Sequence, residues 1–262
     1  MKRCLLVLLG ILLLSSARAQ DFCGLRNTAY HAGESFTLKV FYNLGRIYVG
    51  AGEAVMTINN EKLDGKDVYH IVAAGKTYRS YDWIFKVRDT YQTYIDTATL
   101  QPYKFVRDVN EGGYKINANV TFDRESNTAT STKTKITVPH CVQDVVSAVY
   151  YARNIDFNKY KVNDKITFSM YLDDQVYEIY IRYLGKEEVD TRFGKFRAIK
   201  FKPLLLKGTA FTGGEQMTVW VSDDENKIPL RIDSPISVGS IKVDMIDYKN
   251  LRYPFTSLLG KR

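Results

Sequence analysis

KITFSMYLDDQVYEIYIRYLG, residues 165–185, alternates apolar and polar side chains on either side of the dipeptide Asp173-Asp174. Alternation with a period of two is typical of a β-strand with one buried face, and adjacent aspartates between two such runs indicate a tight turn. This stretch therefore predicts a β-hairpin, and much of the chain repeats its pattern.

Other segments with the same alternation are 35–43, 53–59, 68–75 and 114–123. Turn signals separate them, at Asn59-Asn60, Leu63-Asp64-Gly65, Glu111-Gly112-Gly113 and Gly213-Gly214. Strands joined by short turns form antiparallel sheets. We therefore predict a mostly β fold, with one large antiparallel sheet that is strongly curved or barrel-like.

One stretch, PHCVQDVVSAVYYAR at residues 139–153, breaks the alternation. Valines recur in it at helical spacing, at Val142, Val145, Val146 and Val149, and the opposite side holds Gln143, Asp144 and Ser147. This spacing predicts a helix over about 142–153 that packs its valine face on the sheet.

The sequence on either side of this helix is faintly similar. NEKLDGKDVYHIVA (60–73) can be laid on KEEVDTRFGKFRAIKF (186–201). We interpret residues 20–250 as a single β domain, with two similar halves (about 33–138 and 160–250) joined by the helix. Residues 251–262 are then a C-terminal tail.

The N-terminus, MKRCLLVLLGILLLSSARAQ, has the basic start, apolar stretch and small-residue site of a secretory signal peptide, with cleavage after Ala19. Its apolar stretch of about 10 residues is half of the ~20 that a spanning helix needs. We therefore expect residues 1–19 to be removed and the protein to be exported to the periplasm or the extracellular space, without a transmembrane segment.

Cleavage would lower the formal net charge from +8 to +5, because it removes Lys2, Arg3 and Arg18. The remaining cations are spread among acids, with no run of five like charges. This pattern does not indicate a nucleic-acid-binding surface.

Two cysteines remain after cleavage, Cys23 and Cys141. In an oxidising compartment, an even number of cysteines favours a disulfide over two free thiols. His140 precedes Cys141, which raises the alternative of a nucleophile and its base. Sequence neighbours seldom point side chains at one another, and no cysteine-protease signature surrounds the pair, so a structural cysteine is favoured.

The sequence indicates neither a metal nor a cofactor. His31, His70 and His140 do not repeat at a metal-ligand spacing, and the acids at 223–225 lack the alternating ligands of a calcium loop. No nucleophile elbow, phosphate loop or dinucleotide fingerprint is present.

Aromatic side chains are the best candidates for ligand contacts: Tyr81, Trp83, Phe85, Tyr91, Phe211 and Trp220. On the concave face of a curved sheet they could hold a lipid or stack on sugar rings. The alternative is that they fill the ordinary core of a large β protein.

Four motifs resemble those of exported bacterial proteins catalogued as domain of unknown function 3108: Gly33-Glu34, VRD (87–89), QDVVSAVYYAR (143–153) and FTGGEQMTVWVSDDENKIPLRI (211–232). The resemblance covers about residues 30–250 and implies an envelope protein with no established activity. More weakly, the hairpin from Trp220 to Ile232 is similar to one in the periplasmic lipoprotein carriers, whose incomplete β-barrel wraps a helix and shelters acyl chains.

These observations lead to a hypothesis of function. We expect a non-catalytic envelope protein that binds a lipid-like or other amphipathic component in a concave sheet face. One alternative is an envelope enzyme that acts on glycan or peptide through paired carboxylates such as Asp82, Asp89 or Asp144. Another is an assembly or scaffold protein of the envelope.

Overall fold

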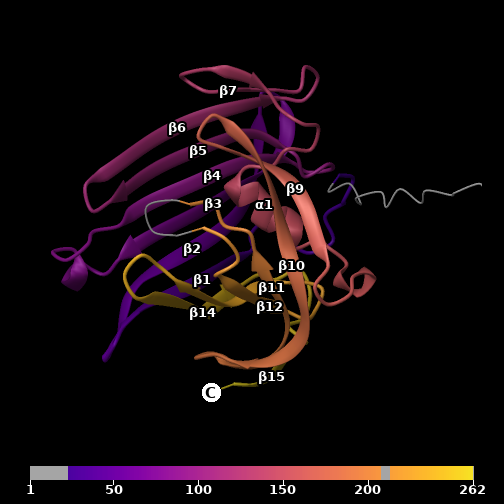
Figure 1. Ribbon diagram of the computed structural model, residues 1–262. Helices are drawn as coiled ribbons and strands as arrows, with labels where there is room; N and C mark the ends of the chain where they lie inside the picture. Colours follow the sequence, from indigo (N-terminus) through magenta and orange to yellow (C-terminus); the bar gives the residue numbers. More distant parts are fainter. Residues whose placement is uncertain (1–22, 208–212, 262) are drawn as a thin grey trace, which may run out of the picture.

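A computed structural model describes residues 23–207 and 213–261, and in this part of the chain strands curl around one α-helix (Figure 1). The strands before the helix are β1 (Ser35–Leu44), β2 (Ile47–Leu63), β3 (Lys66–Thr77), β4 (Arg88–Asp96), β5 (Pro102–Glu111), β6 (Tyr114–Asp123), β7 (Thr128–Thr130) and β8 (Lys135–Thr137). Those after it are β9 (Lys165–Leu172), β10 (Gln175–Asp190), β11 (Gly194–Pro203), β12 (Thr218–Ser222), β13 (Pro229–Pro235), β14 (Ser240–Lys249) and β15 (Leu258–Lys261). The helix is α1 (Val145–Ala152), and the short 3-10 helices are η1 (Arg79–Tyr81) and η2 (Phe157–Lys159).

The strands form one sheet in the order β8-β7-β6-β5-β4-β3-β2-β1-β14-β13-β12-β11-β10-β9. Two antiparallel meanders, β1 to β8 and β9 to β14, therefore meet where β1 pairs with β14. The sheet is not closed between its edge strands β8 and β9. The predicted class, a large curved antiparallel sheet with one helix, is confirmed. Beyond residue 250, where a tail was expected, β15 pairs with β11.

The hairpin of residues 165–185 forms as its alternation predicts. β9 pairs with β10 in register from Gln175 opposite Leu172 to Arg182 opposite Lys165. Asp173 and Asp174 make the turn with φ angles of 50° and 60°. Aspartate tolerates this left-handed conformation, which gives a two-residue turn the twist of the adjoining strands.

Helix α1 starts at Val145, later than the predicted residue 142, and the face that it buries differs from the predicted valine face. Asp144 is its N-cap and accepts hydrogen bonds from the backbone N–H groups of Val146 and Ser147, both 2.9 Å long. The Ser147 hydroxyl accepts in return from the Asp144 N–H at 2.8 Å, which completes a capping box. Asp144 and Ser147 are fully buried with their polar groups paired within this turn, and Gln143 is fully buried beside them.

The prediction that all four valines face the sheet is therefore wrong. Val149 is 40% exposed and Val142 precedes the helix, although Val142 is itself buried. The helix instead buries Val146, Ala148, Tyr150 and Tyr151, and it packs against β3, β4 and β9. A capped polar turn can be buried at little cost, so polarity alone did not identify the outer side of this helix.

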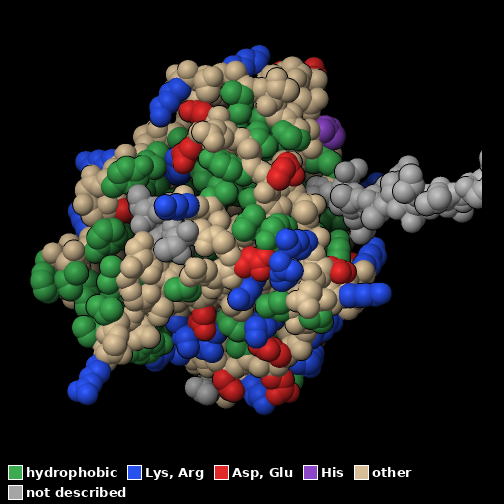
Figure 2. All heavy atoms as spheres, viewed as in Figure 1, with side chains coloured by type: hydrophobic (Ala, Val, Ile, Leu, Met, Phe, Trp, Pro, Cys, Tyr) green, Lys and Arg blue, Asp and Glu red, His purple; other side chains and the backbone are tan. Residues whose placement is uncertain are grey.

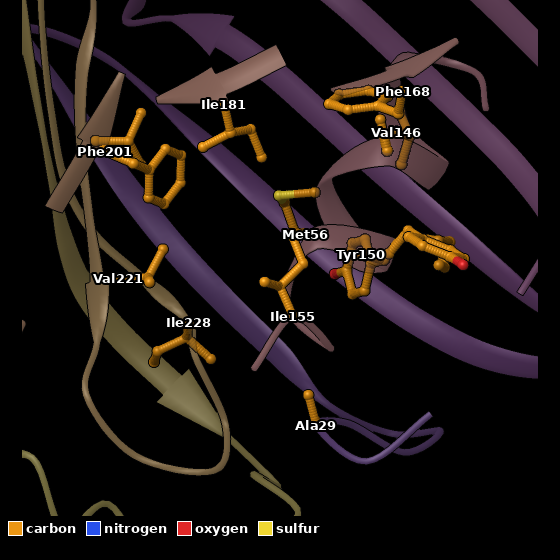
Figure 3. Close-up of a cluster of buried hydrophobic side chains, with 14 of the residues drawn as sticks. Ala29, Met56, Val146, Tyr150, Ile155, Phe168, Ile181, Phe201, Val221 and Ile228 are labelled. Carbon is orange, nitrogen blue, oxygen red and sulfur yellow. The ribbon is translucent and has the colours of Figure 1, made fainter. Parts of the chain in front are cut away.

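The hydrophobic core lies between α1 and the inner face of both meanders (Figure 3). Met56 of β2, Phe168 of β9, Phe201 of β11 and Tyr150 of α1 belong to the same continuous cluster of buried side chains. The helix therefore occupies the part of the concave face formed by β3, β4 and β9.

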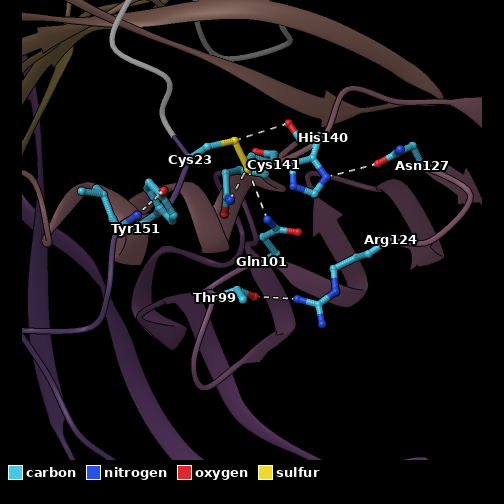
Figure 4. Close-up of a disulfide and its surroundings, with 10 residues drawn as sticks. Cys23, Thr99, Gln101, Arg124, Asn127, His140, Cys141 and Tyr151 are labelled. Atoms are coloured by element: carbon cyan, nitrogen blue, oxygen red, sulfur yellow. Dashed lines mark hydrogen bonds between the residues drawn. A yellow bond between two sulfur atoms is a disulfide. The ribbon is translucent and has the colours of Figure 1, made fainter.

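A disulfide joins Cys23 to Cys141 across 118 residues, as the cysteine count predicts (Figure 4). It ties the described N-terminal end of the chain to the segment that enters α1. Leu25 adds a second tie, since its N–H donates to the Tyr151 hydroxyl at 3.1 Å. Cys141 is thereby excluded as a free nucleophile in this state.

Candidate functional site

A cavity of about 270 Å³ lies at the seam, which we define as the place where the inner side of β5 and β6 meets the β9–β10 turn. Ligand pockets in proteins commonly have volumes of ≈ 300 to 1,000 Å³, so this cavity is near the lower end of that range. Its lining comes from both meanders: Phe105, Arg107, Tyr114, Ile116, Asn117, Ala118, Asn119, Val120, Ser131, Thr132, Lys133, Tyr171, Leu172, Asp173 and Asp174.

The unusual member of this lining is Arg107. Side chains on β5 alternate, and Phe105, Arg107 and Val109 all point to the buried side. The Arg107 Nη2 group donates to the Asp173 carboxylate, so this ion pair spans the seam between the two meanders. The Arg107 Nε group is buried and has no hydrogen-bond partner among the described residues. A buried N–H donor without a partner is costly, and its position beside a cavity suits an incoming acceptor.

The rest of the lining is mixed in character. Phe105, Val120 and Leu172 supply apolar surface, while Arg107, Ser131 and Lys133 supply polar groups. Tyr171, which also lines the cavity, donates to Asp174 at 2.8 Å and contacts Phe122 edge to face. Such a lining suits a molecule with an apolar body and a polar, anionic end.

Tyr91 is the one predicted ligand-contact residue beside this site. It lies directly opposite Arg107 in the β4–β5 ladder, on the same face, with its ring 6.4 Å from that of Phe105. Burial, followed by the nearby Asp89 carboxylate, raises the pKa of the Tyr91 hydroxyl to about 12. Tyr91 is therefore a neutral hydrogen-bonding group at physiological pH.

The structure does not bring the other four described candidates to the cavity. Tyr81, Trp83 and Phe85 lie in or after η1 in the loop between β3 and β4, where Trp83 and Phe85 are exposed. Trp220 is buried in β12 and donates through its indole nitrogen to Glu187 at 2.7 Å. Phe211 lies outside the described residues.

Three of the sequence motifs meet at a different place, in a buried ion pair. Arg153, at the C-terminal end of α1, binds the Glu34 carboxylate through two nitrogens at 2.5 and 2.9 Å. Its Nε and Nη2 groups also donate to the backbone carbonyl of Asn226 at 3.0 and 2.9 Å. Tyr30 and Tyr150 each place a ring 5.1 Å from the guanidinium carbon. This pair connects the N-terminal segment, the helix and the β12–β13 turn, and its role is structural.

The acids named for catalysis each have a different partner. Asp82 is bound by Arg88 at 2.6 Å, and Asp89 accepts from the Asn110 N–H at 2.9 Å. Asp144 caps α1 and accepts a 2.6 Å hydrogen bond from the Thr93 hydroxyl. His140 is exposed, with Nδ1 3.4 Å from the side-chain oxygen of Asn127 (Figure 4). Within the described ranges, no three His, Cys, Asp or Glu side chains form a group that could hold a metal ion.

Asp144 makes the stability of the fold depend on pH. Burial raises the pKa of its carboxyl group from 3.8 to about 6, although the hydrogen bonds it accepts oppose this rise. The folded state therefore holds this proton more tightly than the unfolded chain. The resulting stabilisation is complete below about pH 4 and is lost as the pH rises through about 6, a change on the order of 2 to 3 kcal/mol.

Asp144→Asn should remove this dependence, since asparagine is also a good N-cap and does not titrate. We expect urea unfolding of the two proteins to differ in its pH slope between about pH 4 and pH 6 and to run parallel above about pH 7. Equal slopes throughout that range would contradict the assignment to Asp144.

These features define the class of fold, which is an incompletely closed, barrel-like β-sheet around one helix. Residues 35–246 match the model of the family described as "Protein of unknown function (DUF3108)", and the chain belongs to this family. This confirms the resemblance found in the motifs. No match is found among the curated proteins.

Among solved structures, the chain is similar to a β-barrel-like protein of domain of unknown function DUF1849 from Brucella abortus. The two share 8% identity with a TM-score of 0.56, over 88% of this chain and 100% of the other, so the likeness shows the fold alone. Weaker matches are a candidate exported protein of Bacteroides fragilis with a YmcC-like fold (12% identity, 86% and 100% covered, TM-score 0.36) and a candidate lipoprotein of Parabacteroides distasonis (13%, 84% and 97%, 0.33).

Among the described residues, α1 and the short 3-10 helices include none with the length and apolar character needed to cross a bilayer.

Proposed function

We propose that this chain is a non-catalytic envelope protein that binds a lipid-like amphipathic molecule with an anionic end in the seam cavity. The observation that carries the proposal is Arg107, a buried guanidinium on the inner face of an otherwise largely apolar sheet. The predicted signal peptide and the family resemblance support an envelope location.

The ligand would use both parts of the lining. Its apolar body would cover Phe105, Val120 and Leu172, from which most of the affinity would come. Its carboxylate or phosphate would accept from Arg107, whose planar fork of N–H donors matches such groups. Asp173 is half-exposed and holds Arg107 from the solvent side, so the ligand would compete with Asp173 for the guanidinium.

Binding of dodecanoate, measured by isothermal titration calorimetry, tests the proposal, with dodecanol as an uncharged ligand of the same chain length. Arg107→Met should weaken dodecanoate binding by about tenfold or more, the usual effect of losing a charge-assisted hydrogen bond. Asp173→Asn should strengthen it, because the competing carboxylate is gone. Neither change should alter dodecanol binding by more than about twofold.

Arg182→Met is the matched control, since Arg182 forms a comparable ion pair with Glu215 but does not line the cavity. It should leave dodecanoate binding unchanged. Equal dodecanoate affinity in the wild type and the Arg107→Met variant, or no binding of either amphiphile by the wild type, would overturn the proposal.

A further inference from the structure

Exposed apolar side chains are concentrated at one end of the sheet. Of the eleven large hydrophobic residues exposed in the described part of the chain, eight lie in four turns, at 44–48, 78–88, 111–115 and 236–239. We call this surface the apolar rim, and its principal members are Ile47, Tyr48, Trp83, Ile84, Phe85 and Val238. Figure 2 shows the corresponding gathering of hydrophobic side chains along the left-hand edge of the molecule, over the loop that holds η1 and the ends of β5 and β6.

The strand order brings these turns together. Every second turn of an antiparallel meander falls at the same end, and the pairing of β1 with β14 places the 236–239 turn beside the 44–48 turn. The Tyr42 hydroxyl donates to the Val238 carbonyl at 3.1 Å. On the other side, the Gly112 N–H donates to the Lys86 carbonyl at 2.8 Å, and the Phe85 ring lies against Gly112. These contacts join the four turns in two neighbouring pairs at the same end of the sheet.

The loop between β3 and β4, which carries the most exposed hydrophobic residue, is held in a fixed shape by hydrogen bonds. Arg88 binds both carboxylate oxygens of Asp82, at 3.1 and 2.6 Å, and the Thr77 hydroxyl donates to the same carboxylate at 2.8 Å. Trp83 is 83% exposed, yet its indole N–H already donates to the Ser80 carbonyl at 3.0 Å. The ring could therefore enter an apolar medium without leaving a donor unpaired.

Cationic side chains accompany the apolar ones. Arg46, Arg79, Lys86 and Lys115 are exposed in these turns and form no salt bridge with a described residue. With Arg88, the four turns hold five Lys or Arg residues against two carboxylates, of which Asp82 is bound by Arg88. Apolar and aromatic tips surrounded by cations are the combination that binds an anionic membrane surface.

We propose that the apolar rim docks on a phospholipid bilayer with anionic headgroups. In this arrangement Trp83 and Ile84 enter the interface, and the neighbouring cations contact the headgroups. Tyr114 belongs to the rim and also lines the seam cavity, so the docked surface adjoins the cavity mouth. The inference rests on the rim alone and does not depend on the ligand proposed for the cavity.

Co-sedimentation with vesicles tests this proposal, using phosphatidylcholine alone and an equimolar mixture of phosphatidylcholine and phosphatidylglycerol. The wild type should partition to the mixed vesicles at least about tenfold better than to phosphatidylcholine, with an effect that weakens as salt is added. The double variant Trp83→Ser, Ile84→Ser should lose about tenfold or more of its partitioning. The triple variant Arg46→Gln, Arg79→Gln, Lys86→Gln should lose the preference for mixed vesicles.

Val162→Ser is the matched control, because Val162 is an exposed apolar residue outside the four turns. It should partition like the wild type. Tryptophan emission gives an independent measurement, since Trp220 is buried and Trp83 is exposed. Mixed vesicles should shift the wild-type emission to shorter wavelength, and Trp83→Phe should abolish this shift.

Failure of the vesicle experiment would overturn the proposal, as equal partitioning of the wild type and the Trp83→Ser, Ile84→Ser variant or as no partitioning of the wild type. A dimer that does not bind vesicles, and that the same double substitution dissociates in sedimentation velocity, would also overturn it and would make the rim an interface between copies of this chain. Dodecanoate binding can fail or succeed independently of all these results.

Discussion

Replacing Glu34 by alanine is expected to lower the free energy of unfolding by about 3 to 5 kcal/mol, the usual cost of removing one partner of a buried ion pair. Both side chains of the pair are almost completely enclosed, with 2% of Arg153 and none of Glu34 exposed. Without Glu34, the guanidinium keeps the Asn226 carbonyl and nearby aromatic rings as partners, and no carboxylate. Urea unfolding followed by circular dichroism measures the loss.

Two further variants make this result specific. Glu188→Ala removes the carboxylate of an exposed pair with Lys195 and should cost less than about 1 kcal/mol. Glu34→Leu combined with Arg153→Met should recover much of the loss, because it leaves no charge in the interior. A Glu34→Ala protein as stable as the Glu188→Ala protein would show that the pair does not hold the helix in place.

Loss of the disulfide has a comparable expected effect. In the chain-entropy model, a crosslink that closes a loop of more than a hundred residues contributes roughly 4 to 5 kcal/mol, as an upper estimate. The bond from Cys23 to Cys141 spans 118 residues. Cys23→Ala combined with Cys141→Ala should lower the free energy of unfolding by up to that amount.

Reductant provides the control for this experiment. It should destabilise the wild type to the level of the double variant and leave the double variant itself unchanged. If the wild type unfolds at the same urea concentration with and without reductant while both thiols become alkylated, the crosslink does not stabilise the fold.

The strands were the most predictable part of the molecule, because alternation is a local property of sequence. It gave the β9–β10 hairpin, including its turn at Asp173 and Asp174. The disulfide was predictable because two cysteines in an oxidising compartment leave few alternatives. The family motifs also pointed to real contacts, since Glu34, Arg153 and Asn226 meet in the buried ion pair.

The candidate site was predicted poorly, for two physical reasons. The sequence predicts aromatic residues on the concave face, but local periodicity does not distinguish the inner face of a strand from a loop at its end, where Trp83 and Phe85 lie. The second reason concerns Arg107, which is absent from the predicted residues and lies between Phe105 and Val109 on the buried face of β5. The sequence signal available for it was a charged residue in the alternating series of apolar positions of a strand. Its partner Asp173 could not be found, because it comes from the other meander.

The pairing of β1 with β14 also fixes the order in which the fold can be completed. Ser35 pairs with Lys249, so one edge of the first strand has no partner until nearly the whole chain has been synthesised. The hairpins from β1 to β8 can form one after another from local contacts, whereas the contact that joins the two meanders is as non-local as this chain allows. During that interval β1 is an open strand edge, which other chains can pair with. A newly made copy therefore depends on its own last strands for protection against aggregation.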